Sequence, residues 1–192
     1  MKFLIAILGL CCSSSLMAAD AHFYFGAGLD FGGDTLLEVN YTNGGSEKLT
    51  AGGGAHFAVG TDVDIRQDVM MRGTVGYKVN NVTAENGDLS FTRVPIELTA
   101  YKFFGEHGIG GGVTYLTGGK LKCDISGICD FSASADNTNG MVVEYLYRSR
   151  REDSNKGFSI GVRGVFGVDY TFEGGTESVG GNSLGVNIGM TL

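Results

Sequence analysis

Residues 183–192 read SLGVNIGMTL, and apolar and polar residues alternate through this stretch without a break. The intervening positions hold only small or polar side chains, from Ser183 to Thr191. The apolar positions are Leu184, Val186, Ile188, Met190 and Leu192. Because successive side chains of a β-strand point to opposite faces, the pattern predicts a strand with one apolar and one polar face.

Seven earlier runs alternate in the same way. They span residues 22–32, 49–60, 69–80, 93–101, 109–115, 141–148 and 158–172. Helical spacing is hard to find, and no stretch after the first residues approaches the 18 or so apolar residues of a membrane-spanning helix. The sequence therefore predicts an all-β fold.

The first 19 residues have the order of a secretory signal peptide. Met1-Lys2 supplies a positive start, Phe3 to Leu10 is uninterruptedly apolar, and small residues follow. The apolar run is too short to span a bilayer. Cleavage after Ala19 or after Ala21 satisfies the small-residue rule, and Ala19 is favoured. We expect residues 1–19 to be the signal peptide and residues 20–192 the β-barrel domain.

Composition excludes several classes of protein. Glycine is abundant, at 33 of 192 residues, but no Gly-X-Y period exists and 43% of residues are hydrophobic, which argues against collagen. One proline and 18% charged residues argue against low-complexity disorder. A formal net charge of −7 argues against a nucleic-acid partner, because phosphate binding requires clustered Lys and Arg.

Alternating strands of this kind build either a soluble sandwich or lipocalin-like barrel, or a membrane barrel with the apolar face outward. Two features favour the membrane barrel. The polar face is rich in glycine, as a narrow lumen requires, and its charges nearly balance, as a desolvated interior requires. We predict a lumen ion-pair network of Asp30, Arg72, Lys78, Arg93, Glu97, Glu144, Arg148, Arg163 and Asp169.

Connection lengths point the same way. They alternate long and short, as in outer-membrane barrels with long outward loops and short periplasmic turns. We therefore predict an eight-stranded antiparallel transmembrane up-and-down β-barrel; ten strands stay possible if residues 34–43 form a further hairpin. The periplasmic aromatic girdle should contain Phe23, Phe57, Phe104, Tyr145, Tyr147 and Phe158. The outer girdle should contain Phe31, Tyr77, Tyr115, Tyr170 and Phe172.

Cys123 and Cys129 remain after removal of the signal peptide, six residues apart around a glycine. In an exported chain this spacing is most simply a disulfide, with free thiols as the alternative. A metal site would need further ligands, and no His lies nearby. A disulfide across so short a loop constrains that loop and adds little to the stability of the whole fold.

The sequence resembles the small outer-membrane β-barrel proteins of the OmpA/OmpX/opacity-protein type. The resemblance rests on the signal peptide, the eight amphipathic strands and three local features. The local features are the run Arg93-Val94-Pro95-Ile96-Glu97-Leu98, the tight turn at residues 105–108 and the run Gly110-Gly111-Gly112-Val113. The resemblance spans residues 20–192. It implies residence in the cell outer membrane, contact with outer-membrane lipid and lipopolysaccharide, and a monomeric barrel.

No catalytic, cofactor or metal site is expected. Barrel enzymes that edit lipid A use a His near the outer leaflet, whereas His22, His56 and His107 are predicted at the first strand, in the lumen and in a periplasmic turn. Asp62, Asp64 and Asp68 suggest calcium only loosely, because the glycine and terminal glutamate of an EF-hand are missing.

The outward connections are acidic, with three lysines, Lys48, Lys120 and Lys122. Their ten carboxylates are Asp34, Glu38, Glu47, Glu85, Asp88, Asp124, Asp130, Asp136, Glu173 and Glu177. Long loops on rigid scaffolds commonly carry function. We therefore expect a non-enzymatic role in envelope integrity, surface recognition or adhesion, with an extracellular partner bound through the loops. The alternatives are a narrow pore for small solutes and, less favoured, a lipid A-modifying barrel enzyme.

Overall fold

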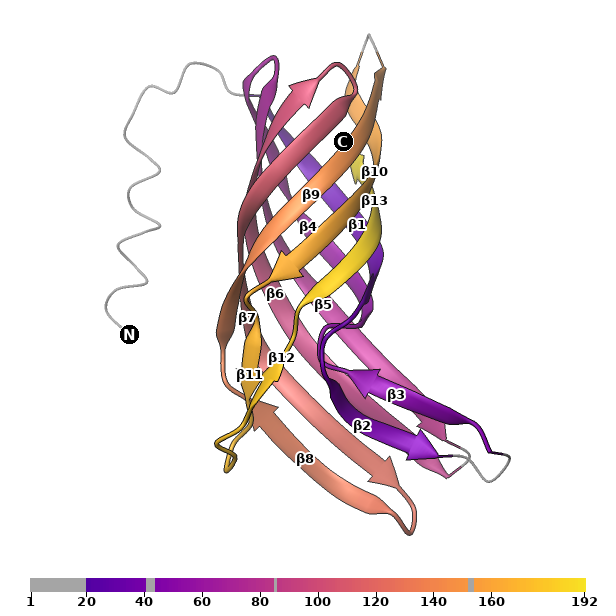
Figure 1. Ribbon diagram of the computed structural model, residues 1–192. Coiled ribbons are helices and arrows are strands. Elements are labelled where there is room, and N and C mark those ends of the chain that lie inside the picture. The colour runs from indigo at the N-terminus through magenta and orange to yellow at the C-terminus, as the bar shows by residue number, and fades with distance from the viewer. Residues whose placement is uncertain (1–19, 41–43, 85, 152–153) are drawn as a thin grey trace.

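The computed structural model describes residues 20–40, 44–84, 86–151 and 154–192, so the predicted signal peptide lies outside the described residues. Within these ranges no helix is long and apolar enough to span a membrane. Eight described strands close into an antiparallel barrel in which each pairs with the next and the last, β13, pairs with the first (Figure 1). They are β1 (Asp20–Phe31), β4 (Gly54–Arg66), β5 (Val69–Ala84), β6 (Gly87–Phe104), β7 (His107–Ile125), β9 (Thr138–Arg151), β10 (Ser154–Phe166) and β13 (Ser183–Thr191).

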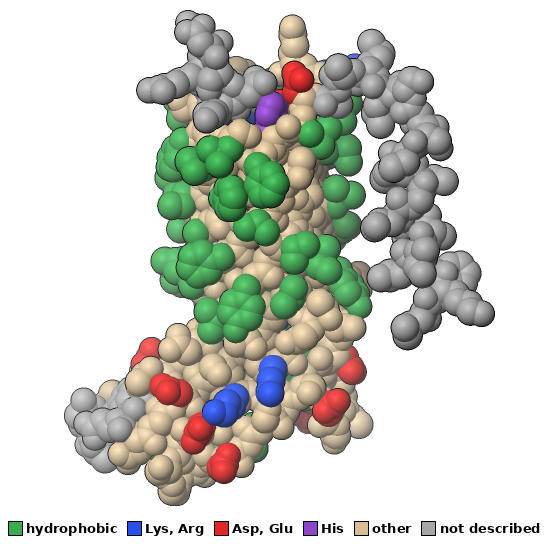
Figure 2. Space-filling model, turned by 180° about the vertical axis from the view of Figure 1, so that it is seen from behind, with side chains coloured by type: hydrophobic (Ala, Val, Ile, Leu, Met, Phe, Trp, Pro, Cys, Tyr) green, Lys and Arg blue, Asp and Glu red, His purple; other side chains and the backbone are tan. Residues whose placement is uncertain are grey.

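The barrel carries its apolar side chains outside, as the sequence predicted. On β1 the side chain of Phe23 is 58% exposed, whereas the neighbouring Tyr24 is 4% exposed and faces the lumen. On β13 the apolar residues alternate in the same way with buried Ser183, Asn187 and Thr191. Figure 2 shows outward hydrophobic side chains as a band across one face of the barrel, with acidic and basic side chains gathered beyond their lower edge. A band of this kind matches the hydrocarbon layer of a membrane.

The two ends of the barrel differ. At one end, turns as short as residues 67–68 and 105–106 join the strands. At the other end β5, β6 and β7 run on into an extension that contains two added hairpins and one added strand paired with β7 (Figure 1). The added strands are β2 (Thr35–Asn40), β3 (Ser46–Thr50), β8 (Cys129–Ala135), β11 (Asp169–Thr171) and β12 (Ser178–Gly180). By the usual asymmetry of outer-membrane barrels, the short turns are periplasmic and the extension is extracellular.

Glycines end the barrel strands where the hairpins begin. Gly33, between β1 and β2, and Gly167, between β10 and β11, have φ of +78° and +72°, which side-chain-bearing residues rarely adopt. A Cβ at Gly33 would also collide with the backbone nitrogen of Gly52. The chain therefore leaves the barrel at these glycines and folds over an apolar core that includes Leu49, Phe91 and other residues outside the membrane band.

Two alternating runs were predicted with the wrong extent. Residues 49–60 are not one strand, because the backbone bends between β3 and β4 and buries Leu49 and Ala51 completely in the extension. The strand β4 instead continues to Arg66, through most of the connection expected at residues 61–68. The further hairpin that the sequence left open is formed by the antiparallel strands β2 and β3, but it lies outside the barrel, which keeps eight strands.

The prediction of one continuous strand over residues 158–172 was also wrong beyond Phe166. The turn at Gly167 carries Val168 and Tyr170 into the extracellular core, where they are 0% and 2% exposed. Tyr170 therefore does not belong to the outer girdle, and Phe172 is only half-exposed against the same core. The other girdle error concerns Phe57.

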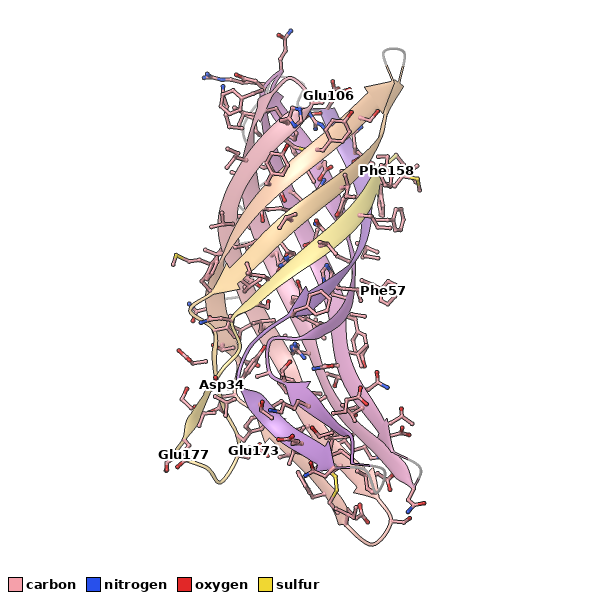
Figure 3. All side chains as sticks on the ribbon, turned by 45° about the vertical axis from the view of Figure 1, so that its right-hand side comes forward. Asp34, Phe57, Glu106, Phe158, Glu173 and Glu177 are labelled. Atoms are coloured by element: carbon pink, nitrogen blue, oxygen red, sulfur yellow. A yellow bond between two sulfur atoms is a disulfide. The ribbon has the colours of Figure 1, made fainter. Side chains whose placement is uncertain are left out.

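Phe57 was assigned to the wrong rim. It lies directly across from Tyr77 on β5, so it belongs on the extracellular side of the band rather than at the periplasmic rim. The labelled positions of Phe57 and Phe158 in Figure 3 show this separation along the barrel. The error follows from the wrong limits of β4, because Phe57 is near the extracellular end of a strand that runs on to Arg66.

Candidate functional site: the filled lumen and the extracellular extension

The periplasmic half of the lumen is organised by Arg72 and Asp62. Arg72 on β5 donates two hydrogen bonds to the Asp62 carboxylate on β4, Nε to Oδ1 at 2.7 Å and Nη2 to Oδ2 at 2.9 Å. Thr191 on β13 donates a third, from Oγ1 to Oδ2 at 2.9 Å. The guanidinium carbon of Arg72 lies 3.5 Å from the ring centre of Tyr24. The carboxylate of Asp62 is therefore buried with its charge compensated and links three strands.

Closer to the periplasm, Arg148 and His22 lie beside Asp64. Nη1 of Arg148 is 3.6 Å from Oδ1 of Asp64, and Nε2 of His22 is 3.7 Å from Oδ2. The Arg148 guanidinium also lies over the ring of Phe103, at 3.8 Å from its centre. These groups fill the lumen next to the periplasmic turns.

The middle of the lumen holds Arg163, Glu97 and Glu144. Arg163 on β10 donates from Nη2 to Oε1 of Glu97 on β6, across the barrel, at 2.6 Å. Glu144 accepts hydrogen bonds from the Tyr101 hydroxyl and from Nδ2 of Asn187, each at 3.0 Å. Glu144 is therefore stabilised by neutral donors in these contacts, whereas Arg163 and Glu97 form an ion pair.

The extracellular end of the lumen is held by two groups. In the first, Asp30 contacts Nζ of Lys78 at 2.7 Å and Nδ1 of His56 at 3.0 Å. In the second, Arg93, only 1% exposed, donates to the backbone carbonyl of Gly53 at 2.6 Å and lines the same small cavity as Tyr170. Arg93 therefore ties the bend before β4 to the barrel.

The structure places eight of the nine residues predicted for the lumen inside the barrel. The exception is Asp169, which is exposed on β11 because the turn at Gly167 carries it out of the barrel. Asp62 and Asp64 were not predicted for the lumen because the alternating run was expected to end at residue 60, whereas β4 continues to Arg66. Their alternation in phase with His56 was the signal that placed them on the lumen face.

Side chains leave little space in the lumen. Two cavities inside it measure about 20 Å³ each, one between Asp30, Arg93 and Tyr170 and the other between Tyr24, Arg72 and Glu144. A cavity needs about 10–15 Å³ to hold one water molecule. Each of these cavities is therefore of the size that one or two waters fill, far smaller than a solute pathway.

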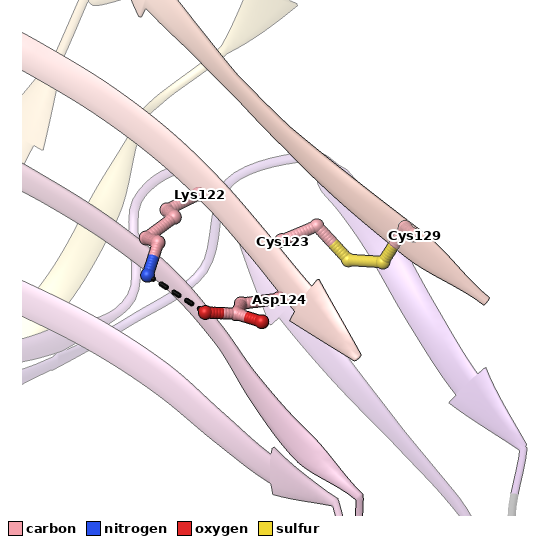
Figure 4. Close-up of a disulfide and its surroundings, with 4 residues drawn as sticks. All are labelled: Lys122, Cys123, Asp124 and Cys129. Carbon is pink, nitrogen blue, oxygen red and sulfur yellow. Dashed lines mark hydrogen bonds and ion pairs between the residues drawn. A yellow bond between two sulfur atoms is a disulfide. The ribbon is translucent and has the colours of Figure 1, made fainter. Parts of the chain in front are cut away.

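The predicted disulfide between Cys123 and Cys129 is present and lies at the tip of the β7–β8 hairpin (Figure 4). The two Cα atoms are 5.8 Å apart, and the Cys123 side chain is part of the apolar core of the extension. On the outer face, Lys122 donates to Asp124 at 3.0 Å, and this hydrogen bond raises the pKa of the Lys122 ammonium. Burial likewise raises the pKa of the Tyr170 phenol in the core.

The three histidines lie at different levels of the barrel. His22 and His56 are buried in the lumen, and His107 lies at a periplasmic turn, where its Nδ1 is 2.6 Å from the Tyr145 hydroxyl. His56 lies at the extracellular end of the lumen beside Asp30, but its side chain is only 6% exposed, so the barrel wall separates it from the outer leaflet, where a lipid A-modifying enzyme would meet its substrate.

The sequence matches no protein-family model and no curated protein. Several solved structures share its fold. Ail, the attachment invasion locus protein of Yersinia pestis, solved in complex with the heparin analogue sucrose octasulfate, has a TM-score of 0.51 at 10% identity, over 92% of this chain and 100% of Ail. Neisserial surface protein A has a TM-score of 0.55 at 14% identity, over 92% and 99% of the two chains. Outer membrane protein AlkL, solved in lipid bilayers, has a TM-score of 0.52 at 12% identity, over 94% and 90%.

At these identities the likeness concerns the fold, and the fold is that of small eight-stranded outer-membrane barrels, as the sequence predicted. The outward apolar band and the buried charges of the lumen agree with it. The chain is an integral β-barrel protein of the outer membrane.

Proposed function

We propose that this protein is a non-enzymatic, monomeric surface protein whose filled barrel is a membrane anchor and whose extension recognises an extracellular partner. The observation that carries the proposal is the contrast between the two parts. The lumen is packed with paired charges, and the two cavities described within it are of water size, whereas the extension has a core of its own and a disulfide at its tip. A contribution to envelope integrity is compatible with the same anchor.

The chemistry of the extension limits the class of partner. Ail was solved with a sulfated heparin analogue, which is strongly anionic. The extension here carries many more carboxylates than lysines, so an anionic polysaccharide would meet repulsion. Recognition of a neutral or cationic partner is therefore favoured.

Recognition is tested by shortening the β7–β8 hairpin. Lys122 and Ser132 are cross-strand neighbours, so replacing Cys123–Phe131 by Asn-Gly joins them through a two-residue hairpin turn. Cells that display the wild-type protein should attach to a protein-coated surface, and cells that display the shortened protein in equal amount should not. If cells with the wild-type and the shortened protein attach equally, the extension is not the recognition site.

The second candidate, a narrow pore, is tested by planar-bilayer conductance. We expect the wild-type barrel to pass no steady current, because Arg163 and Glu97 cross the lumen. The double variant Glu97→Ala/Arg163→Ala removes both charges together, leaves no uncompensated partner, and should hydrate the lumen and raise the current. The matched control removes the exposed pair Asp68 and Lys102 at a periplasmic turn and should change nothing. A steady wild-type current would favour the pore.

An enzymatic role in lipid A modification has its own measurement. Mass spectrometry of lipid A from cells that overexpress the protein should show the same species as cells without it. A new lipid A mass that disappears on substitution of His56 would overturn the non-enzymatic proposal.

A further inference from the structure

The apolar core of the extension is incompletely covered. Its floor is fully buried, as in Phe91 and Leu89, but inward-facing residues on the surrounding strands are only half-covered. On β8, Phe131 pairs with the buried Cys123 and so lies on the inward face, yet its side chain is 42% exposed. We call these half-covered residues the distal apolar face: Leu37, Val39, Cys129, Phe131, Phe172 and Val179.

The membrane does not cover this face. Its residues belong to the hairpins of the extension, beyond the outward apolar band of the barrel. Ile128, at the tip of the same hairpin as Phe131, is 77% exposed. Apolar side chains that are exposed in water rather than in lipid commonly mark a protein-binding surface.

The strand β8 also has an unpaired edge. It is the last strand of the nine-stranded sheet and pairs with β7 on one side. On its other side, the described contacts with β11 involve only the end of β8, through Ser134 and Ala135. The backbone groups of residues 129–133 that point away from β7 are thus available to an added strand, which is a common mode of peptide recognition.

Charges on this edge specify the partner further. Side chains alternate along β8, so Cys129, Phe131 and Ala133 face the apolar core whereas Asp130 faces outward. Glu173 and Glu177 lie at the neighbouring β11–β12 turn and project from the flank of the extension (Figure 3). An added strand would therefore meet an apolar surface on one face and the Asp130 carboxylate on the other, where the nearby Lys122 is paired with Asp124.

We propose that the free edge of β8 binds an extended cationic polypeptide segment in which apolar and basic residues alternate. Its apolar residues cover Phe131 and the rest of the distal apolar face, and its Lys or Arg residues lie beside Asp130. Cross-strand pairs of opposite charge and apolar cross-strand pairs both stabilise such an addition. A second copy of this chain is a poorer occupant, because it brings carboxylates of its own. The inference rests on the proposed recognition function and names the chemistry of the partner.

The test uses the full barrel in zwitterionic nanodiscs and a fluorescent ten-residue peptide of alternating Val and Lys, with empty nanodiscs as the blank. Three control peptides isolate the requirements. One has the same composition with Val and Lys in separate blocks, one has Glu in place of Lys, and one carries N-methyl groups on alternate amides, which removes strand pairing and keeps charge and apolar surface. We expect only the first peptide to bind, with affinity that falls as salt rises.

Two variants of the protein complete the test. Phe131→Ser should weaken binding about tenfold, as for an anchor at an interface, and Asp130→Asn about threefold with a flatter salt dependence. The matched controls are Ile65→Ser and Asp20→Asn, exposed residues at the periplasmic end, and should leave binding unchanged. Equal binding of the N-methylated or Glu peptide would overturn the proposal, as would self-association of the wild type through this face.

The N-methylated peptide needs no mutation, so the outcome does not depend on whether Phe131→Ser folds. Failure of this inference is distinguishable from failure of the proposed function. If no peptide binds while cells still attach through the β7–β8 hairpin, the recognition role stands and the cationic strand is wrong. If the shortened hairpin leaves attachment unchanged, the recognition role itself is wrong.

Discussion

The buried charged residues of the lumen make two kinds of contact. Asp62 is completely buried and accepts three hydrogen bonds, two of them from Arg72, so its desolvation is offset by a compensated charge. Arg93 instead donates to a backbone carbonyl and thereby fixes the bend before β4. The first kind of contact holds the barrel closed, and the second positions the extension.

Asp62→Asn should be strongly destabilising. The substitution leaves the guanidinium of Arg72 buried without its counter-charge, which costs about 3–5 kcal/mol for a buried pair. Urea titration in detergent, followed by the gel shift between folded and unfolded barrel, measures the change. The control Asp68→Asn breaks an exposed pair with Lys102 and should cost no more than about 1 kcal/mol. Equal effects of the two substitutions would contradict the compensated-charge account.

At the scale of elements, the hairpins are built by breaks in the barrel strands. Glycines with positive φ end β1 and β10, whereas β5, β6 and β7 continue into the extension as strands, with one irregularity in the β6–β7 register beside Gly118, which also has a positive φ. The extension therefore combines continuous strands on one side with hinged hairpins on the other, packed on a shared core. Its stability depends on that core and on the disulfide rather than on lipid.

Removing the disulfide should loosen the hairpin and leave the barrel intact. The bridge closes a short loop and contributes about 2 kcal/mol by chain entropy. In the variant Cys123→Ser/Cys129→Ser, limited proteolysis should cut near residues 126–128 faster, while the urea midpoint of the barrel stays unchanged. Reduced wild-type protein should behave as the variant does. A shift of the barrel midpoint would show that hairpin and barrel unfold together.

For the whole molecule, the decisive property is that apolar side chains face outward and charged side chains face inward, the reverse of a water-soluble protein. Isoleucines such as Ile160 lie half-exposed on the outside of the barrel, while arginines lie inside. Such a surface is stable only where hydrocarbon covers it. The same kind of residue at the hairpin tip, Ile128, is exposed to water instead.

This difference makes a matched pair of substitutions informative. Ile160→Arg, in the middle of β10, should cost about 2–4 kcal/mol in a bilayer, because it places a charge on the lipid face. Ile128→Arg, at a more exposed position, should cost almost nothing. Folding into lipid vesicles against urea measures both. In a water-soluble barrel both substitutions would be tolerated alike, so equal tolerance would contradict membrane insertion.

The sequence by itself determined the strand faces, the number of barrel strands and the buried character of residues such as Arg72 and Glu144. It could do so because alternation is a local property with a period of two. It failed at residues 49–60 and 158–172, where alternation continues through a glycine bend although the side chains move from lipid to the extracellular core. The backbone conformation at those glycines leaves no trace in the pattern.

Only the tertiary structure decided which charges meet. Arg72 pairs with Asp62 ten residues away, whereas Arg163 reaches Glu97 from a strand on the other side of the barrel. These partners are set by the register and closure of the whole barrel. The half-covered core beside the free edge of β8 arises in the same way, because it depends on how hairpins distant in the sequence pack against one another.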